Sequence, residues 1–255
     1  MIPFYRAFSF AGVGLLRSRH LKQLQKIESD SYQILHDLAV RQGASPENIK
    51  AQIGQDLFVL FSLIWKRGGY FVEFGATNGV DLSNTYLLEK DFGWSGVLAE
   101  PAEVWHNDLK LNRTASLDFD CVWKETGQIL QFQVTPDAEY STLSEFTNSD
   151  THSKERREGA IQSVKTVTLN DLLERHKAPD LIDYLSIDTE GSEYEILKNF
   201  DFDRYAVSVI TCEHNFSDNR KKVYDLLAGK GFMRVYEGLS RWDDWFVNCD
   251  CIDKK

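Results

Sequence analysis

Helical periodicity dominates the N-terminal region from residue 17 to residue 66. Apolar side chains recur near helical spacing over residues 17–41, which predicts an amphipathic helix. Ser45-Pro46-Glu47 is typical of a second helix start, because a serine at the N-cap precedes a proline in the first turn. This second helix should end at Gly68-Gly69. We therefore predict an N-terminal helical cap or extension over residues 1–66.

From Tyr70 onward, short β-rich runs alternate with helical segments. The predicted strands are Tyr70–Phe74, Gly96–Ala99, Asp118–Trp123, Ile129–Val134, Leu181–Ile187 and Ala206–Cys212, followed by a hairpin of Phe232–Tyr236 and Trp245–Val247. The predicted helices between and after the strands include Glu193–Phe200 and Lys221–Ala228. The strands at Leu181–Ile187 and Ala206–Cys212 are almost continuously apolar, which is typical of strands that are buried on both faces of a parallel sheet. The alternation predicts an α/β, Rossmann-like domain over residues 67–255.

Composition narrows the classes of partner. The net charge is −10, which opposes binding to a nucleic-acid duplex and suits a neutral or cationic small ligand. No run approaches the roughly 20 apolar residues of a membrane span, so we expect no stable membrane insertion and take the cytoplasm as the default location. The four cysteines match no zinc pattern and are expected to be free. The polar stretch 135–159 is predicted to be a mobile excursion.

A glycine-containing turn follows the first predicted strand. Gly75 and Gly79 punctuate this turn, where the backbone must bend tightly and approach a ligand closely. Glu73 lies near the end of the strand, and the next strand delivers Glu100 at its carboxyl end. An acidic side chain in that place can accept hydrogen bonds from the two hydroxyls of a ribose.

Two kinds of ribose-containing cofactor fit this pattern. A dinucleotide needs closely spaced glycines around its pyrophosphate, but the G-x-G-x-x-G spacing is absent here because Ala76 and Thr77 intervene. A carboxylate such as Glu73 is also a poor neighbour for pyrophosphate, whereas it suits the ammonium group of a methionine moiety. The turn therefore favours S-adenosylmethionine, and a dinucleotide-dependent oxidoreductase stays open as the alternative.

A second group of acidic residues follows two later strands. Asp188 and Glu190 end the strand at Leu181–Ile187, and Glu213-His-Asn215 ends the next one. Ligands bind outside the carboxyl ends of parallel strands, so these residues should share a crevice with the glycine turn. Structural roles are also open: Asp188 as a helix N-cap, Glu190 as a first-turn acid, His214 as a surface histidine, and the Glu213 and Asn215 pair as turn chemistry.

Longer motifs give a family resemblance. The segments that carry it are Glu73-Phe-Gly-Ala-Thr-Asn-Gly79, Ser83-Asn-Thr-Tyr-Leu-Leu-Glu89, Glu100-Pro101, Val167-Thr-Leu-Asn-Asp-Leu-Leu173, Ile182-Asp-Tyr-Leu-Ser-Ile-Asp-Thr-Glu-Gly191 and Glu213-His-Asn215. In this order they resemble the FkbM-type methyltransferases over roughly residues 50–250. The resemblance implies a class I methyltransferase fold with a mostly parallel seven-stranded sheet, and O-methylation of hydroxyls, often those of sugars and glycans.

The resemblance also assigns residues to the cofactor. S-adenosylmethionine is expected to contact Glu73, Gly75, Ala76, Asn78, Gly79, Ser83, Asn84, Thr85, Glu100, Val122 and Asp188. Among these, Glu73, Gly75, Asn78 and Gly79 would line the methionine end, and Glu100 would hold the ribose. The stretch around Cys121 and Val122 would flank the adenine.

The catalytic residues expected from the sequence are Asp188, His214 and Glu213. His214 is a candidate general base because a histidine titrates near neutral pH, and Asp188 is the alternative base. Asp188, Glu213 and Asn215 also resemble an oxygen-rich Mg²⁺ or Mn²⁺ site, so metal dependence stays open. A non-catalytic glycan-binding module on the same scaffold is the other alternative. The acceptor is expected to be a small molecule or a glycan, and a homo-oligomer stays open.

Overall fold

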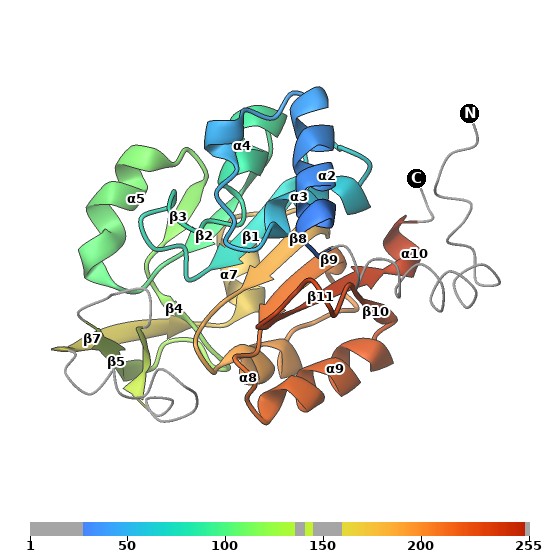
Figure 1. The fold of residues 1–255 in the computed structure, drawn as a ribbon. Helices are drawn as coiled ribbons and strands as arrows, with labels where there is room; N and C mark the ends of the chain where they lie inside the picture. Colours follow the sequence, from blue (N-terminus) through green and yellow to red (C-terminus); the bar gives the residue numbers. More distant parts are fainter. Residues whose placement is uncertain (1–27, 136–140, 145–159, 253–255) are drawn as a thin grey trace.

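The computed structural model describes residues 28–135, 141–144 and 160–252 (Figure 1). The start of the helix predicted over 17–41 and nearly all of the predicted excursion over 135–159 lie outside these residues. None of the helices in the described ranges combines the length and the apolar character that a membrane span requires. Cys121, Cys212 and Cys249 are free thiols, as expected.

A seven-stranded sheet forms the centre of the molecule, in the order β10-β11-β9-β8-β1-β2-β3. Its strands are β1 Tyr70–Phe74, β2 Ser95–Ala99, β3 Ser116–Asp118, β8 Leu181–Ile187, β9 Ala206–Glu213, β10 Phe232–Val235 and β11 Asp243–Asn248. The neighbouring strands β9, β8, β1, β2 and β3 pair in parallel, whereas β11 pairs antiparallel with both β9 and β10. The predicted mostly parallel seven-stranded sheet and its C-terminal hairpin are confirmed.

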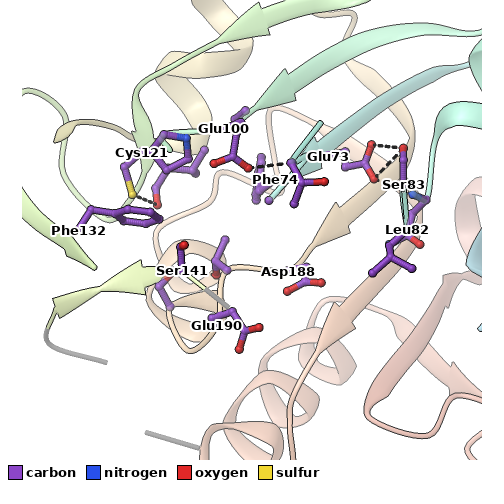
Figure 2. A pocket seen from close by; sticks show the side chains of 18 of the residues that line it. Glu73, Phe74, Leu82, Ser83, Glu100, Cys121, Phe132, Ser141, Asp188 and Glu190 are labelled. Carbon is purple, nitrogen blue, oxygen red and sulfur yellow. Dashed lines mark hydrogen bonds between the residues drawn. The ribbon is translucent and has the colours of Figure 1, made fainter. Parts of the chain in front are cut away.

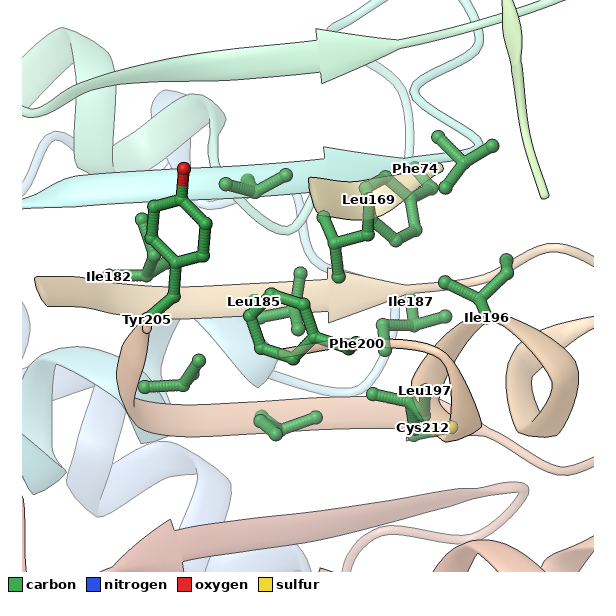
Figure 3. Close-up of a cluster of buried hydrophobic side chains, with 14 of the residues drawn as sticks. Phe74, Leu169, Ile182, Leu185, Ile187, Ile196, Leu197, Phe200, Tyr205 and Cys212 are labelled. Carbon is green, nitrogen blue, oxygen red and sulfur yellow. The ribbon is translucent and has the colours of Figure 1, made fainter. Parts of the chain in front are cut away.

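Helices cover both faces of this sheet (Figure 1). One face carries α2 Glu28–Arg41, α3 Gln55–Ser62, α4 Tyr86–Phe92 and α5 His106–Asn112, and the other carries α7 Leu169–Arg175, α8 Glu193–Lys198 and α9 Asn219–Gly229. Successive side chains of a strand point to opposite faces of the sheet, so each strand contributes to the apolar core on both faces. Phe71 packs with the first group of helices, and Val72 and Phe74 pack with the second. Figure 3 shows Phe74 in the second core. A last short helix, α10, spans Cys249–Ile252.

The N-terminal extension differs from the prediction of one long second helix. A 3₁₀ turn at Pro46–Asn48 is followed by α3, and Gly54 separates them with a left-handed φ of 85°. That backbone conformation cannot continue a helix. The Phe58 ring stacks on Trp245 with ring centroids 4.6 Å apart, so α3 belongs to the core of the sheet. A domain boundary at residue 66 stays a prediction.

The segment predicted as one strand over Asp118–Trp123 is two strands in two sheets. After β3, the chain leaves the large sheet and forms β4 Cys121–Val122, which pairs in parallel with β7 Ala160–Val167. The missed strand β7 pairs antiparallel with β5 Ile129–Val134, and β5 also pairs with β6 Thr142–Leu143. These strands form a second sheet in the order β4-β7-β5-β6. Phe132 and Leu143 belong to its own small apolar cluster.

Candidate functional site

A cavity lies at the carboxyl ends of β1, β2 and β8, where the second sheet faces the large one (Figure 2). Its empty space is about 880 Å³ when the part open to solvent is included. The predicted site residues that line it are Glu73, Gly75, Ser83, Asn84, Glu100, Val122 and Asp188. The predicted residues that do not line it are Ala76, Asn78, Gly79, Thr85, Glu213, His214 and Asn215.

The second sheet supplies a cavity wall that sequence reasoning missed. Phe132, Ser141 and Leu143 line the cavity, and Figure 2 shows Phe132 beside Cys121. Thr142, which is fully buried, donates through its hydroxyl to the backbone oxygen of Glu190 at 3.0 Å. This bond ties the wall to the loop after β8. No local signal marks these residues, since their position depends on strand pairing across the excursion.

Gly75 holds the ends of three strands together. Its N–H donates to the Ala99 oxygen at the end of β2 (3.1 Å), and its φ is +70°. A Cβ at this position would lie 2.2 Å from the backbone oxygen of Asp188, which follows β8. Only glycine permits so close an approach in this backbone conformation. The predicted requirement for glycine therefore has a steric cause within the protein itself.

Glu100 is buried at the end of β2, with both carboxylate oxygens bound by backbone N–H groups. Thr77 donates to Oε2 at 2.9 Å, and Ala102 donates to Oε1 at 2.8 Å. Burial, together with the charge of Asp188, raises the pKa of the Glu100 carboxyl to about 7. The two backbone bonds fix the carboxylate at the cavity, and each oxygen keeps a further lone pair for a ligand hydroxyl.

Glu73 borders the cavity, but its carboxylate is bound within the protein. It accepts hydrogen bonds from the Asn84 backbone N–H (2.7 Å) and from the hydroxyls of Ser83 and Thr85. The buried guanidinium of Arg113 lies 3.7 Å from it and also contacts the Thr85 hydroxyl. The carboxylate therefore fixes the loop over residues 83–85 and neutralises a buried cation.

Two residues predicted to line the methionine end shape the turn instead. The Asn78 side-chain oxygen accepts the N–H groups of Val80 and Asp81, which closes a local turn. Gly79 faces away from the cavity, because a Cβ there would lie 2.6 Å from atoms of Arg113 and Leu109. Neither residue lines the cavity, so the direct contacts predicted for them are not supported by this geometry.

Asn84 presents an unused acceptor at the cavity. Its amide nitrogen donates to the Ser186 hydroxyl at 2.9 Å. Its Oδ1 atom is buried and has no hydrogen-bond partner among the residues that the structure describes. A buried carbonyl oxygen without a donor is costly, so this atom is suited to a donor group on a ligand.

Three carboxylates lie close together on the side of the cavity opposite Glu100. Side-chain oxygens of Asp188, Glu190 and Glu213 all lie within 4.8 Å of one another. Burial raises the pKa of Glu213 well above its ordinary value, and the charges of Asp188 and Glu190 raise it further. Asn215, predicted as a ligand oxygen, instead donates its amide N–H to Glu190 at 3.1 Å. The third acid of this acidic cluster is therefore Glu190.

The helix-cap interpretation of Asp188 is wrong. Helix α8 begins at Glu193, its N-cap residue is Ser192, and Asp188 lies a full turn earlier at the cavity. The acids in the first turn are Glu193 and Glu195, and the Glu193 carboxylate accepts the N–H groups of Thr189 and Gly191. Glu190 precedes the helix with a φ of 59°. Helix geometry thus leaves Asp188 and Glu190 at the cavity.

His214 is buried behind the cluster and does not fit the role of a general base. Its Nδ1 accepts the Phe216 N–H at 3.0 Å, which uses the only lone pair of a neutral imidazole ring. Burial and the nearby Arg220 lower its pKa to about 4. Its Nε2 lies 3.9 Å from Asp244, away from the residues that line the cavity. The surface-histidine interpretation is wrong as well, since the side chain is 3% exposed.

The cavity has a consistent chemical character. Carboxylates stand on both sides, and apolar side chains of β4, β5 and β6 close one end (Figure 2). Asn84, whose Oδ1 has no hydrogen-bond partner among the described residues, also lines the cavity. Such a site suits a ligand with hydroxyl groups, an ammonium group and a further positive charge. A pyrophosphate would meet carboxylates where it needs donors.

Comparison with known protein families gives a match over most of the chain. Residues 73–250 match the family model described as Methyltransferase FkbM domain, a range that includes every predicted site residue. No curated protein matches the sequence significantly.

Solved structures show only distant likeness. A precorrin-6Y C5,15-methyltransferase from Geobacter metallireducens GS-15 is 12% identical, with a TM-score of 0.39 over 81% of this chain and 93% of that chain. Methyltransferase FkbM from Methylobacillus flagellatus KT is 10% identical, with a TM-score of 0.44 over 85% of this chain and 57% of that chain. The METTL16 methyltransferase domain is 13% identical, with a TM-score of 0.39 over 74% of this chain and 63% of that chain.

Proposed function

The chain belongs to the FkbM methyltransferase family and is a class I S-adenosylmethionine-dependent methyltransferase, and we propose that it methylates a hydroxyl group of a sugar or glycan. The observation that carries the proposal is the pairing of two acidic groups across one cavity. Glu100 is aimed by two backbone bonds on one side, and the acidic cluster lies on the other. The first can bind a ribose, and the second can act on a hydroxyl acceptor.

The residues present fit S-adenosylmethionine. The unpaired Oδ1 of Asn84 would accept from the ammonium group of the methionine end. Glu100 would accept from the ribose hydroxyls, and Cys121 and Val122 would flank the adenine. The negative charges of Glu100 and Asp188, which repel each other, would both be offset by a sulfonium.

The acidic cluster would prepare the acceptor. When bound, S-adenosylmethionine supplies an activated methyl group, and the acceptor oxygen must lie in line with the methyl and the sulfur. Burial and the charges of Asp188 and Glu190 raise the pKa of Glu213 well above its ordinary value, which favours the protonated form of Glu213. Asp188 would then accept the proton of the acceptor hydroxyl through a carboxylate oxygen.

A divalent cation is the second way in which the acidic cluster could act. Oxygens of Asp188, Glu190 and Glu213 would hold Mg²⁺ or Mn²⁺, which would polarise the acceptor hydroxyl. Asn215 drops out of this set because its amide nitrogen faces Glu190. Turnover in chelator separates the two mechanisms: unchanged turnover leaves Asp188 as the base, and loss that Mg²⁺ restores assigns the cation.

Mass spectrometry of a sugar panel tests the proposed function. The purified protein, incubated with S-adenosylmethionine and a set of mono- and oligosaccharides, should add one methyl group to at least one sugar. Asp188→Asn should lower the yield of that product by about 10²–10³-fold. Methylation confined to acceptors without a sugar would contradict the proposed acceptor, and absence of all transfer despite cofactor binding would favour the non-catalytic glycan-binding alternative.

A further inference from the structure

An exposed aromatic residue, Phe216, lies in the loop that follows Glu213 of the acidic cluster. Phe216 follows β9 by three residues and is 70% exposed, although phenylalanine is ordinarily buried. Among the aromatic residues of the C-terminal region, Trp245 and Phe246 are buried in the core and Trp242 is half-buried. Tyr224 on α9 is 36% exposed, about half as much as Phe216. Core packing therefore does not explain the exposure of the Phe216 ring.

The loop that carries Phe216 is held in an unfavourable backbone conformation. Asn215 and Phe216 have φ values of 40° and 57°, in the left-handed region that costs an L-residue about 1 kcal/mol or more. Several bonds enforce it: the Trp242 oxygen accepts from the N–H groups of His214 and Asn215, and His214 Nδ1 accepts from Phe216. The His214 ring also meets the Phe216 ring edge-on, with centroids 5.1 Å apart. These contacts hold an exposed ring in one place.

The same loop is joined to the acidic cluster. Asn215, the residue before Phe216, donates to Glu190, and Glu213 is itself a member of the cluster. An exposed apolar ring thus lies within a few residues of several hydroxyl acceptors. This is the combination that binds a sugar, because a pyranose has an apolar C–H face and an edge of hydroxyl groups.

We propose that Phe216 is the platform on which the sugar ring of the acceptor rests, with its hydroxyl edge toward Asp188 and Glu190. The inference rests on the proposed function and extends it to the acceptor subsite. The negative charge of the cluster selects a neutral sugar over a uronic acid or a phosphosugar. His214 is a positioning residue, which acts by holding the Phe216 N–H.

Kinetics with paired acceptors test the platform. The probes are methyl glycosides of neutral hexoses and of the corresponding hexuronic acids, each with S-adenosylmethionine. Phe216→Ala should raise KM for the neutral glycoside about tenfold, with kcat and the Kd for S-adenosylhomocysteine within about twofold of wild type. Phe216→Tyr, which keeps the ring, should restore KM. Leu111→Ala, which removes another exposed apolar side chain on α5, is the matched control and should change nothing.

Two outcomes separate this inference from the proposed function. Unchanged KM in Phe216→Ala, with transfer to the glycoside intact, would overturn the platform and leave the function standing. No transfer to any glycoside by a protein that binds S-adenosylhomocysteine would overturn the sugar acceptor and the platform together. A preference for the hexuronic acids would contradict the charge argument on which the choice of a neutral sugar depends.

Variants of His214 test the positioning role. His214→Asn keeps an acceptor for the Phe216 N–H, whereas His214→Leu removes it. We expect His214→Leu to raise KM as Phe216→Ala does, and His214→Asn to rescue most of that loss. If both variants instead lowered kcat about a hundredfold or more, His214 would be a general base and the positioning role would be wrong.

Discussion

Glu73 and Glu213 are the same residue type at equivalent places, near the carboxyl ends of two parallel strands of one sheet, but their surroundings are opposite. Glu73 is surrounded by donors and by the buried Arg113. Glu213 is surrounded by Asp188, Glu190 and Asp243, and its pKa is raised. The comparison shows that a carboxylate at a strand end can be fixed by hydrogen-bond donors and a cation, or can lie among other carboxylates whose negative charges repel it. Only the second kind gains from an incoming cation or an acceptor proton.

Gly75 is where these two regions touch, so the largest effect is expected there. Gly75→Ala would place a Cβ 2.2 Å from the Asp188 oxygen and force the two sides apart. We expect loss of S-adenosylhomocysteine binding and a fall of about 4 kcal/mol or more in the free energy of unfolding. Gly127→Ala is the control, because φ is +86° there with open space around it. It should cost about 1 kcal/mol. Equal losses measured by denaturant unfolding would contradict the steric argument.

Arg113→Met tests the surroundings of Glu73. The guanidinium is fully buried and lies 2.9 Å from Glu89 and 3.7 Å from Glu73. Its removal takes the buried counter-charge from both carboxylates and leaves Glu89 with the partly exposed Lys90. We expect a loss of about 3–5 kcal/mol in the free energy of unfolding. Lys110→Met, an exposed cation on α5, should stay within about 0.5 kcal/mol of wild type. A similar small change for Arg113→Met would show that Glu73 needs no anchor.

Asp188→Asn in the acidic cluster should have the opposite effect: activity should fall while the free energy of unfolding does not. Removing one like charge from the acidic cluster should leave the free energy of unfolding unchanged or raise it by about 1 kcal/mol. Methyl transfer should nevertheless fall about 10²–10³-fold, because the proton acceptor is lost. Asp180→Asn, an exposed acid just before the other end of β8, is the control and should retain full activity. Wild-type turnover by Asp188→Asn would remove Asp188 from the mechanism.

The pH dependence of stability gives the smallest of these effects. The folded-state pKa of Glu100 is raised from 4.5 to about 7, so its contribution to stability is present below about pH 4.5 and is lost as the pH rises through 7. We expect the cofactor-free protein to lose up to about 3 kcal/mol over this range from Glu100. Glu100→Gln should reduce the decline in a urea titration series. An identical slope in the variant would contradict the assignment.

The sequence was sufficient where burial is continuous along the chain. The strands at Tyr70–Phe74 and Leu181–Ile187 were predicted with the bounds that the structure has, because the first is rich in β-forming side chains and the second is a nearly continuous apolar run. Parallel pairing then requires their carboxyl ends to share an edge, and this placed Glu73, Glu100 and Asp188 around one cavity.

The pattern of apolar and polar residues could not predict which strands pair or where a side chain points. Strand β7 has the mixed sequence of a strand with one exposed face, and its partner β5 is separated from it by the excursion. Phe132 and Leu143 were therefore missed as cavity residues. His214 was predicted as a base because its position fits, but a hydrogen bond from an N–H two residues away determines its role.

Calorimetry with S-adenosylhomocysteine tests the central claim most directly, because it measures the cavity without needing the acceptor. The account predicts binding in the micromolar range to the wild-type protein, about a hundredfold weaker binding to Glu100→Gln, and no binding of NADH. Glu103→Gln, an exposed acid nearby, should bind as the wild type does. Absence of S-adenosylhomocysteine binding, or equal affinity in Glu100→Gln, would contradict the account.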